Sequence, residues 1–142
     1  MNIHTAKTDA DILKCWLVLK ELRPHLEENK FLARIKEMFT EGYRLAFIEE
    51  NGKAVAAIGF RYENFLHCGK HFYIDDLSTL PQARGKGYGG MLLDHVAALA
   101  KERGFELIIL DSGHHRYTAH RLYLNKGFEI KSHHFVKRLD HA

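Results

Sequence analysis

The sequence predicts an α/β fold, with one domain over residues 1–142 in which about four helices flank a mixed sheet. Two observations lead to this fold class. The first half of the chain has strand-like segments on both sides of Asn51-Gly52, a dipeptide typical of tight antiparallel hairpins. The second half alternates strand and helix patterns, which is typical of βαβ units with parallel strands. A chain of 142 residues, 46% of them hydrophobic, can bury a core of its own.

In the first half, apolar side chains recur at helical spacing in two segments. Thr8 or Asp9 can cap the first helix, and Pro24 ends it because proline has no N–H to donate. Gly42 closes the second. The expected elements are a strand at 3–6, a helix from Thr8 or Asp9 to Pro24, a helix at 30–40, and strands at 44–49 and 53–62.

The second half begins with a strand that is reached over a loop near His67 to Lys70. A strongly periodic helix follows, and Gly104 is placed to end it in a left-handed conformation. Gly127 is placed in the same way after a shorter helix. The expected elements are a strand at 72–80, a helix at 88–103, a strand at 106–111, a helix at 116–126 and a final pair of strands.

The most informative segment lies between the strand at 72–80 and the helix at 88–103, and reads Gln82-Ala83-Arg84-Gly85-Lys86-Gly87-Tyr88-Gly89-Gly90. Glycines let backbone N–H groups approach a phosphate oxygen, because no Cβ holds the ligand away. The first turn of the following helix adds unpaired N–H donors and the positive end of the helix dipole. Arg84 and Lys86 add formal positive charge. The segment therefore predicts a site for a phosphorylated ligand.

Two phosphate-binding patterns compete for this segment. The dinucleotide pattern G-x-G-x-x-G is matched by Gly85, Gly87 and Gly90. Its first glycine should follow the strand directly, whereas Pro81 to Arg84 intervene here. Asp75 and Asp76 also interrupt what should be an apolar, buried parallel strand. We therefore favour the pattern Q-x-x-G-x-G, which is met by Gln82, Gly85 and Gly87.

With this pattern the chain resembles the GNAT superfamily of acyl-CoA-dependent N-acetyltransferases. The first matching motif is Leu77-Ser78-Thr79-Leu80-Pro81-Gln82-Ala83-Arg84-Gly85-Lys86-Gly87-Tyr88-Gly89. The second is Ala119-His120-Arg121-Leu122-Tyr123-Leu124-Asn125-Lys126-Gly127-Phe128. The segment from Leu110 to Tyr123 looks most like the aminoalkylphosphonate and related small-amine acetyltransferases.

The resemblance implies the family's α/β sandwich, acetyl-CoA as cosubstrate, and a small-molecule amine as acceptor. Backbone groups of Leu77 to Thr79 would hold the pantetheine arm and polarise the thioester carbonyl. Arg116 stands where many members have an asparagine, so the role of that asparagine does not transfer. The residues implied to hold CoA are Leu77, Ser78, Thr79, Gln82, Arg84, Gly85, Lys86, Gly87, Tyr88, Gly89, Arg116 and Ala119.

The resemblance also assigns a general acid. Tyr123 matches the tyrosine that protonates the departing thiolate of CoA in the family. A phenol with a pKa of about 10 is a suitable donor to a thiolate as the C–S bond breaks. Without the resemblance, a tyrosine on this helix would be interpreted as core packing.

A general base is needed because an aliphatic amine, with a pKa of about 10.4, is almost entirely protonated at pH 7. We predict that Asp75 is the base and that Asp76 recognises the substrate, since the segment 73–77 resembles the acidic pair of diamine and polyamine acetyltransferases. The alternative is one solvated acid and one ion-pair partner. Because adjacent strand residues face opposite sides of a sheet, only one carboxylate is expected to point into a given pocket.

Composition bears on the remaining function classes. The net charge of +3 is mild and the basic residues are scattered, so no nucleic acid partner is expected. No segment is long enough to span a membrane, and Cys15 and Cys68 have no C-x-x-C spacing, so we expect a reduced, cytoplasmic setting. The 11 histidines form no compact ligand pattern, so no metal is expected.

The favoured function is transfer of an acetyl group from acetyl-CoA to a primary amine of a small molecule, directly within a ternary complex. Neither cysteine is placed as a nucleophile. The alternatives are acetylation of a protein N-terminus or lysine, and a CoA-binding regulatory module without catalysis. Monomer and homodimer both stay open. An anionic group beside the amine is favoured by Arg61, Arg116, His67, His71, His114 and His115.

Overall fold

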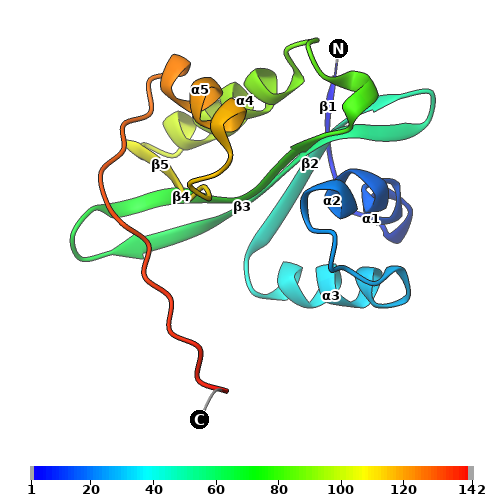
Figure 1. Cartoon of the computed structure of the whole chain (residues 1–142), viewed down its shortest axis with the longest axis horizontal. Helices are drawn as coiled ribbons and strands as arrows, with labels where there is room; N and C mark the ends of the chain where they lie inside the picture. Colours follow the sequence, from blue (N-terminus) through cyan, green and yellow to red (C-terminus); the bar gives the residue numbers. More distant parts are fainter. Residues whose placement is uncertain (1, 141–142) are drawn as a thin grey trace. The chain divides into compact units, whose positions relative to one another are not determined.

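A computed structural model of the chain describes residues 2–140, which form two compact units, one up to Leu110 and one from Asp111 (Figure 1). The first unit contains β1 (Ile3–Thr5), α1 (Asp9–Lys14), α2 (Trp16–Leu22), α3 (Glu28–Thr40), β2 (Tyr43–Glu50), β3 (Lys53–Phe65), β4 (Gly69–Thr79), the 3-10 helix η1 (Pro81–Ala83), α4 (Tyr88–Glu102) and β5 (Leu107–Leu110). The second unit contains α5 (Tyr117–Asn125).

The five strands form one mixed sheet in the order β1-β2-β3-β4-β5. The first four strands pair antiparallel, and β5 pairs parallel to β4. This confirms the predicted α/β class. The hairpin between β2 and β3 turns through Asn51 and Gly52, whose φ angles of 54° and 77° are both left-handed, as a two-residue hairpin turn requires. The loop expected near His67 to Lys70 is shorter than predicted, because β3 runs on to Phe65 and β4 starts at Gly69.

Helices cover both faces of this sheet, with α4 on one side and α1, α2 and α3 on the other (Figure 1). On the α1–α3 side, the ring of Phe39 stacks on Tyr43 of β2 with centroids 6.3 Å apart. On the α4 side, the guanidinium of Arg103 lies 5.2 Å from the ring centroid of Phe72 in β4. The central strands are therefore buried on both faces, which explains their nearly continuous apolar sequence.

The first helix is capped as predicted but is interrupted. Thr8 and Asp11 form a capping box, in which each side chain accepts from the other residue's backbone N–H. At Cys15 the backbone N–H bonds to the carbonyl of Ile12, three residues back, and α2 begins at Trp16. Residues 2–140 therefore hold five α-helices where about four were expected. No helix in this range has the length and apolar character needed to cross a membrane.

The predicted final pair of strands is wrong for the described residues. Residues 128–140 contain no strand, and the apolar side chains of Ile130, Phe135, Val136 and Leu139 are exposed. A strand is stabilised by hydrogen bonds and side-chain pairs with a neighbouring strand, and no strand pairs with this segment in the structure. Alternating apolar residues alone do not supply that partner.

Candidate active site

The glycine-rich segment forms a compact connection between β4 and α4. After Thr79 the chain passes through η1, and Gly85 and Gly87 both adopt φ angles of +83°. A Cβ at either glycine would meet no atom within 4 Å, so backbone conformation and not crowding favours glycine here. Gly87 is the N-cap of α4 and has no side chain to accept from the first turn of the helix. The loop thus offers backbone donors to an anion in open space, and its composition fits a CoA pyrophosphate.

Both cations of this loop are paired with carboxylates from elsewhere in the first unit. Lys86 Nζ lies 2.9 Å from Glu50 Oε2, at the end of β2. Arg84 Nη2 lies 3.3 Å from Glu21 Oε1, in α2. The hydroxyl of Tyr88, the first residue of α4, also donates a short hydrogen bond to Glu50. Sequence reasoning did not identify Glu21 or Glu50, because no local pattern relates them to the loop.

The edge of β4 that leads into the loop is left open by β5. The parallel ladder covers only His71 to Ile74 of β4, and β5 ends at Leu110, opposite Ile74. The strand continues to Thr79 with β3 on its other side. Among the described residues, no strand pairs with the second edge of residues 75–79. An extended ligand chain can bind such an edge in the manner of an added strand.

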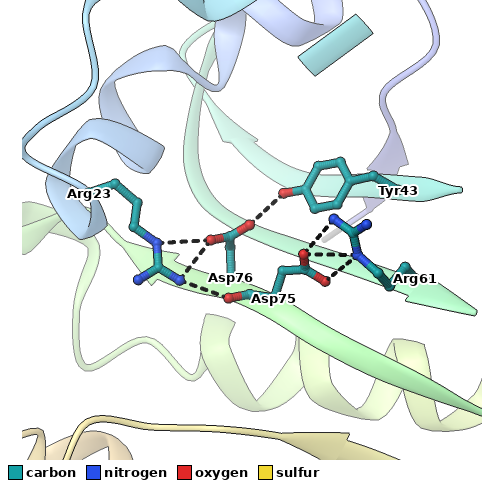
Figure 2. Close-up of polar contacts among 5 residues, drawn as sticks. All are labelled: Arg23, Tyr43, Arg61, Asp75 and Asp76. Carbon is teal, nitrogen blue, oxygen red and sulfur yellow. Dashed lines mark hydrogen bonds and ion pairs between the residues drawn. The ribbon is translucent and has the colours of Figure 1, made fainter. Parts of the chain in front are cut away.

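Asp75 and Asp76 lie together, close to the start of this open edge (Figure 2). Arg61 donates to the Asp75 carboxylate through Nε and through Nη2, the latter at 2.7 Å. Asp76 accepts from the Tyr43 hydroxyl at 2.8 Å, and Arg23 Nη2 lies 3.0 Å from Asp76 Oδ1. Two arginines thus neutralise two carboxylates in one cluster.

The prediction that the two carboxylates face opposite sides of the sheet is wrong. Gly59 of β3 pairs with Asp76 and Phe60 pairs with Ile74, so Asp75 is an extra residue in β4, a β-bulge. The bulge breaks the alternation of side chains, and Asp75 and Asp76 both reach partners on the side of Tyr43 (Figure 2). On this side the Arg61 guanidinium lies 5.5 Å from the centroid of the Tyr43 ring.

Tyr43 takes its position because residue 59 is glycine. A Cβ at Gly59 would lie 1.8 Å from the Tyr43 hydroxyl oxygen, which is far inside contact distance. Gly59 lies within a buried strand, and such a glycine indicates a close approach of another group to the backbone. That signal was present in the sequence, although it does not identify Tyr43 as the group. Arg23, at the end of α2, left no comparable signal.

The surroundings of Asp75, Arg61 and Tyr43 shift the pKa of each of these groups. Burial raises the pKa of the Asp75 carboxyl above its usual value, and the contact with Arg61 opposes this effect without cancelling it. The hydrogen bond to Asp75 raises the pKa of Arg61, which stays charged. Burial, reinforced by Asp76, raises the pKa of Tyr43 well above its usual value, so its hydroxyl stays protonated and donates to Asp76. Asp75 is thus a carboxylate with an increased affinity for protons.

The residues of the second motif are described within the second unit. Arg116 is the N-cap of α5 and is exposed, and Ala119 and Tyr123 lie half-buried on that helix, one turn apart. The ring of Tyr123 packs edge-on against Phe128, with centroids 5.8 Å apart. The helix therefore holds Ala119 and Tyr123 along one side, as expected from their spacing of four residues.

Neither cysteine is set up as a nucleophile. Cys15 is fully buried, and burial raises the pKa of its thiol to about 12. Cys68 Sγ lies 3.7 Å from His71 Nδ1, but that nitrogen also lies 2.9 Å from the carbonyl oxygen of Gly69. Because a carbonyl only accepts, Nδ1 carries a proton and donates it to Gly69, so it cannot take a proton from Cys68. His71 is itself fully buried, so it is not placed to meet an anionic group of the substrate, contrary to the prediction.

Residues 2–140 contain no group of three or more histidine, cysteine, aspartate or glutamate side chains that could hold a metal ion. His71 Nε2 lies 3.0 Å from Glu63 Oε1, and His120 Nε2 lies 2.8 Å from the carbonyl oxygen of Gly113. His114 and His115 contact each other edge to face. These four histidines therefore have local partners within the protein.

Comparison with known proteins decides the family. The model of the acetyltransferase (GNAT) family matches residues 10–128. The chain belongs to this family. It is 38% identical over 122 residues to N-acetyltransferase YhdJ of Bacillus subtilis (strain 168), covering 84% of this chain and 86% of the relative. It is 31% identical over 140 residues to the aminoalkylphosphonate N-acetyltransferase of Salmonella typhimurium (strain LT2), covering 96% of this chain and 89% of the relative.

Solved acetyltransferase structures share the fold of this GNAT protein. The aminoglycoside N-acetyltransferase AAC(6′)-Iy in complex with CoA superposes with a TM-score of 0.82 at 16% identity, covering 98% of this chain and 94% of that one. Together with the family membership and the named relatives, these findings identify the chain as an acyltransferase, and acetyl transfer is the activity that they support.

Proposed function

We propose that this GNAT protein transfers an acetyl group from acetyl-CoA directly to the primary amine of a small molecule that also carries an anionic group. The observation that carries the proposal is that one continuous segment, residues 75–89, contains three features in a row. These are the acidic pair Asp75 and Asp76, the open strand edge at 75–79, and the glycine loop with its two cations. These three features supply, in order, a base, a site for an extended thioester arm and a site for a pyrophosphate.

In the proposed reaction, acetyl-CoA supplies a thioester whose carbonyl carbon is the electrophile and whose thiolate is the leaving group. Asp75 accepts a proton from the substrate ammonium, which frees the nitrogen lone pair for attack. Backbone N–H groups of Leu77 to Thr79 stabilise the charge that develops on the carbonyl oxygen. The amine nitrogen forms a bond to the carbonyl carbon, and Tyr123 donates its proton to the sulfur as the C–S bond breaks. The second proton that the nitrogen loses on becoming an amide restores the Tyr123 phenol, and the proton on Asp75 is released to solvent. Cys15 is buried and the pKa of its thiol is raised, which supports direct transfer over an acyl-enzyme intermediate.

The acidic cluster supports an acceptor that carries both charges. Asp75 can attract the ammonium, while Arg61 presents a planar guanidinium, suited to a phosphonate or carboxylate, next to it. The ion pair with Asp75 engages Nε and Nη2 of Arg61 and leaves Nη1 outside that pair. The Salmonella relative acts, by its name, on aminoalkylphosphonates. Binding of a zwitterionic amine would thus replace the contact between Asp75 and Arg61 by two contacts. Its ammonium would contact Asp75, and its anionic group would contact Arg61.

The test is thiol release from acetyl-CoA with a panel of amines at equal concentration. We expect the highest kcat/KM with an aminoalkylphosphonate, a lower value with the alkylamine of equal chain length that lacks the phosphonate, and little activity with a polyamine or an N-terminal peptide. A preference for the polyamine would overturn the anionic group, and activity with the peptide alone would overturn the small-molecule acceptor. Acetyl-CoA binding without thiol release from any amine would favour the regulatory module.

Tyr123→Phe tests the general acid. The substitution keeps the ring that packs against Phe128 but removes the hydroxyl proton. We expect kcat to fall roughly 10- to 1,000-fold, with little change in affinity for acetyl-CoA, because the loss is confined to the transition state. Steady-state kinetics and calorimetry measure the two quantities. An unchanged kcat would mean that Tyr123 only packs.

A further inference from the structure

Glu50, the last residue of β2, contacts the glycine loop that carries Arg84 and Lys86 and leads into α4. Its Oε2 atom accepts from Lys86 Nζ at 2.9 Å and also from the hydroxyl of Tyr88, in a short hydrogen bond. The hydrogen bond from Tyr88 and then that from Lys86 lower the pKa of Glu50, so the group is a carboxylate at neutral pH. Glu50 therefore brings a negative charge to a loop whose expected ligand is also an anion.

The two partners hold Glu50 in different ways. Tyr88 is only 5% exposed and begins α4, so it fixes the carboxylate from the buried side. The Lys86 side chain is 47% exposed, and its flexible stem can turn the ammonium toward solvent or toward another anion. When an anion binds to the loop, Glu50 stays in place and Lys86 can exchange partners.

We propose that Glu50 competes with the pyrophosphate of CoA for Lys86 and thereby sets how tightly the loop binds the cosubstrate. This inference rests on the proposed function, because it takes acetyl-CoA as the ligand of the loop. A carboxylate and a phosphate oxygen both accept from an ammonium, so Lys86 cannot give its full charge to one while it pairs with the other. Glu50 is thus a positioning residue that acts on the ligand through Lys86.

The other cation of the loop, Arg84, is also paired with a carboxylate, but at a longer distance. Arg84 pairs with Glu21 at 3.3 Å, and its Nε also donates to the carbonyl oxygen of Thr79 at 3.3 Å. Both side chains of that pair are more exposed than those of Lys86 and Glu50, at 60% and 40% against 47% and 27%. Solvent screens an exposed pair more strongly, so Glu50 is expected to have the larger effect.

Glu50→Gln separates charge from shape, because the amide oxygen can still accept from Tyr88. Glu49→Gln is the matched control: it removes the same charge from the neighbouring residue, whose carboxylate pairs with Lys14 at 2.6 Å and not with the loop. Calorimetry with acetyl-CoA at low salt should give a Kd about two- to fivefold lower for Glu50→Gln than for Glu49→Gln, the size expected for release of one exposed ion pair.

The same two glutamate variants are also compared in a Lys86→Gln background. Without the ammonium, Glu50→Gln and Glu49→Gln should change the Kd equally, because no cation remains to be released. Thermal unfolding of each variant shows whether it is folded. If Glu50→Gln does not fold, Glu50→Asp replaces it, since the shorter side chain keeps the net charge but draws back from Lys86, and it should likewise lower the Kd.

The outcomes separate this inference from the proposed function. A folded wild-type protein that does not bind acetyl-CoA would overturn both. Binding by the wild type, with Glu50→Gln equal to Glu49→Gln or weaker than the wild type, would overturn the competition alone. A lower Kd for Glu50→Gln that disappears in the Lys86→Gln background supports it.

Discussion

Gly87→Glu should abolish acetyl-CoA binding while leaving the fold intact. The substitution places a carboxylate at the N-cap of α4, where the pyrophosphate is proposed to bind. Two anions would then compete for the same first-turn donors and for Lys86. A Cβ at this position meets no atom within 4 Å, so the side chain can be accommodated. Calorimetry with acetyl-CoA is the measurement, and we expect no detectable heat of binding.

The control for this prediction must carry the same backbone strain. Gly87 has a φ of +83°, and a residue with a Cβ costs roughly 1–2 kcal/mol in that conformation. Gly104→Glu meets the same requirement at the other end of α4, with a φ of +76° and open space around its Cβ. It should lose similar stability and keep its acetyl-CoA affinity. Unchanged affinity in a folded Gly87→Glu variant would contradict the loop assignment, and competition by NADH would restore the dinucleotide interpretation.

The parts of the fold that the sequence predicted correctly depend on neighbours in the chain. The turn at Asn51-Gly52 and the capping box at Thr8 each need only a few consecutive residues. The final pair of strands failed for the opposite reason, since a strand at 128–140 would need a partner that alternation within the segment cannot specify. The break at Cys15 also had no proline or glycine to indicate it.

The same division applies to the site. The glycine loop is one continuous segment, so its residue order was enough to predict a glycine-rich connection between a strand and a helix. The acidic cluster depends on the register between β3 and β4, because one extra residue in β4 turns Asp75 toward the side of Asp76. Tyr43, Arg23 and Glu50 come from elements far away in the sequence. Only tertiary packing brings them to the loop and the cluster.

Asp75→Asn should reduce kcat by about 10²- to 10⁴-fold if Asp75 is the general base, because an amide cannot accept the ammonium proton. Asp76→Asn is the comparison. Two guanidinium nitrogens of Arg23 and the hydroxyl of Tyr43 contact the Asp76 carboxylate, to which we assign substrate recognition. We expect Asp76→Asn mainly to raise KM for the amine. Initial rates over a range of amine concentrations separate the two effects, and a larger loss of kcat in Asp76→Asn would reverse the assignment.

The pH profile gives the base a signature that a structural role would not produce. Burial raises the pKa of Asp75, and the base must be ionised, so kcat/KM should fall as the pH drops through that raised pKa. Arg61 holds this pKa down, so Arg61→Gln should raise it further and move the acid limb to higher pH. Arg23 contacts Asp75 through the backbone carbonyl and not through the carboxylate, and Arg23→Gln should therefore move the limb less. Equal shifts in the two arginine variants, or none in either, would mean that another group carries the acid limb.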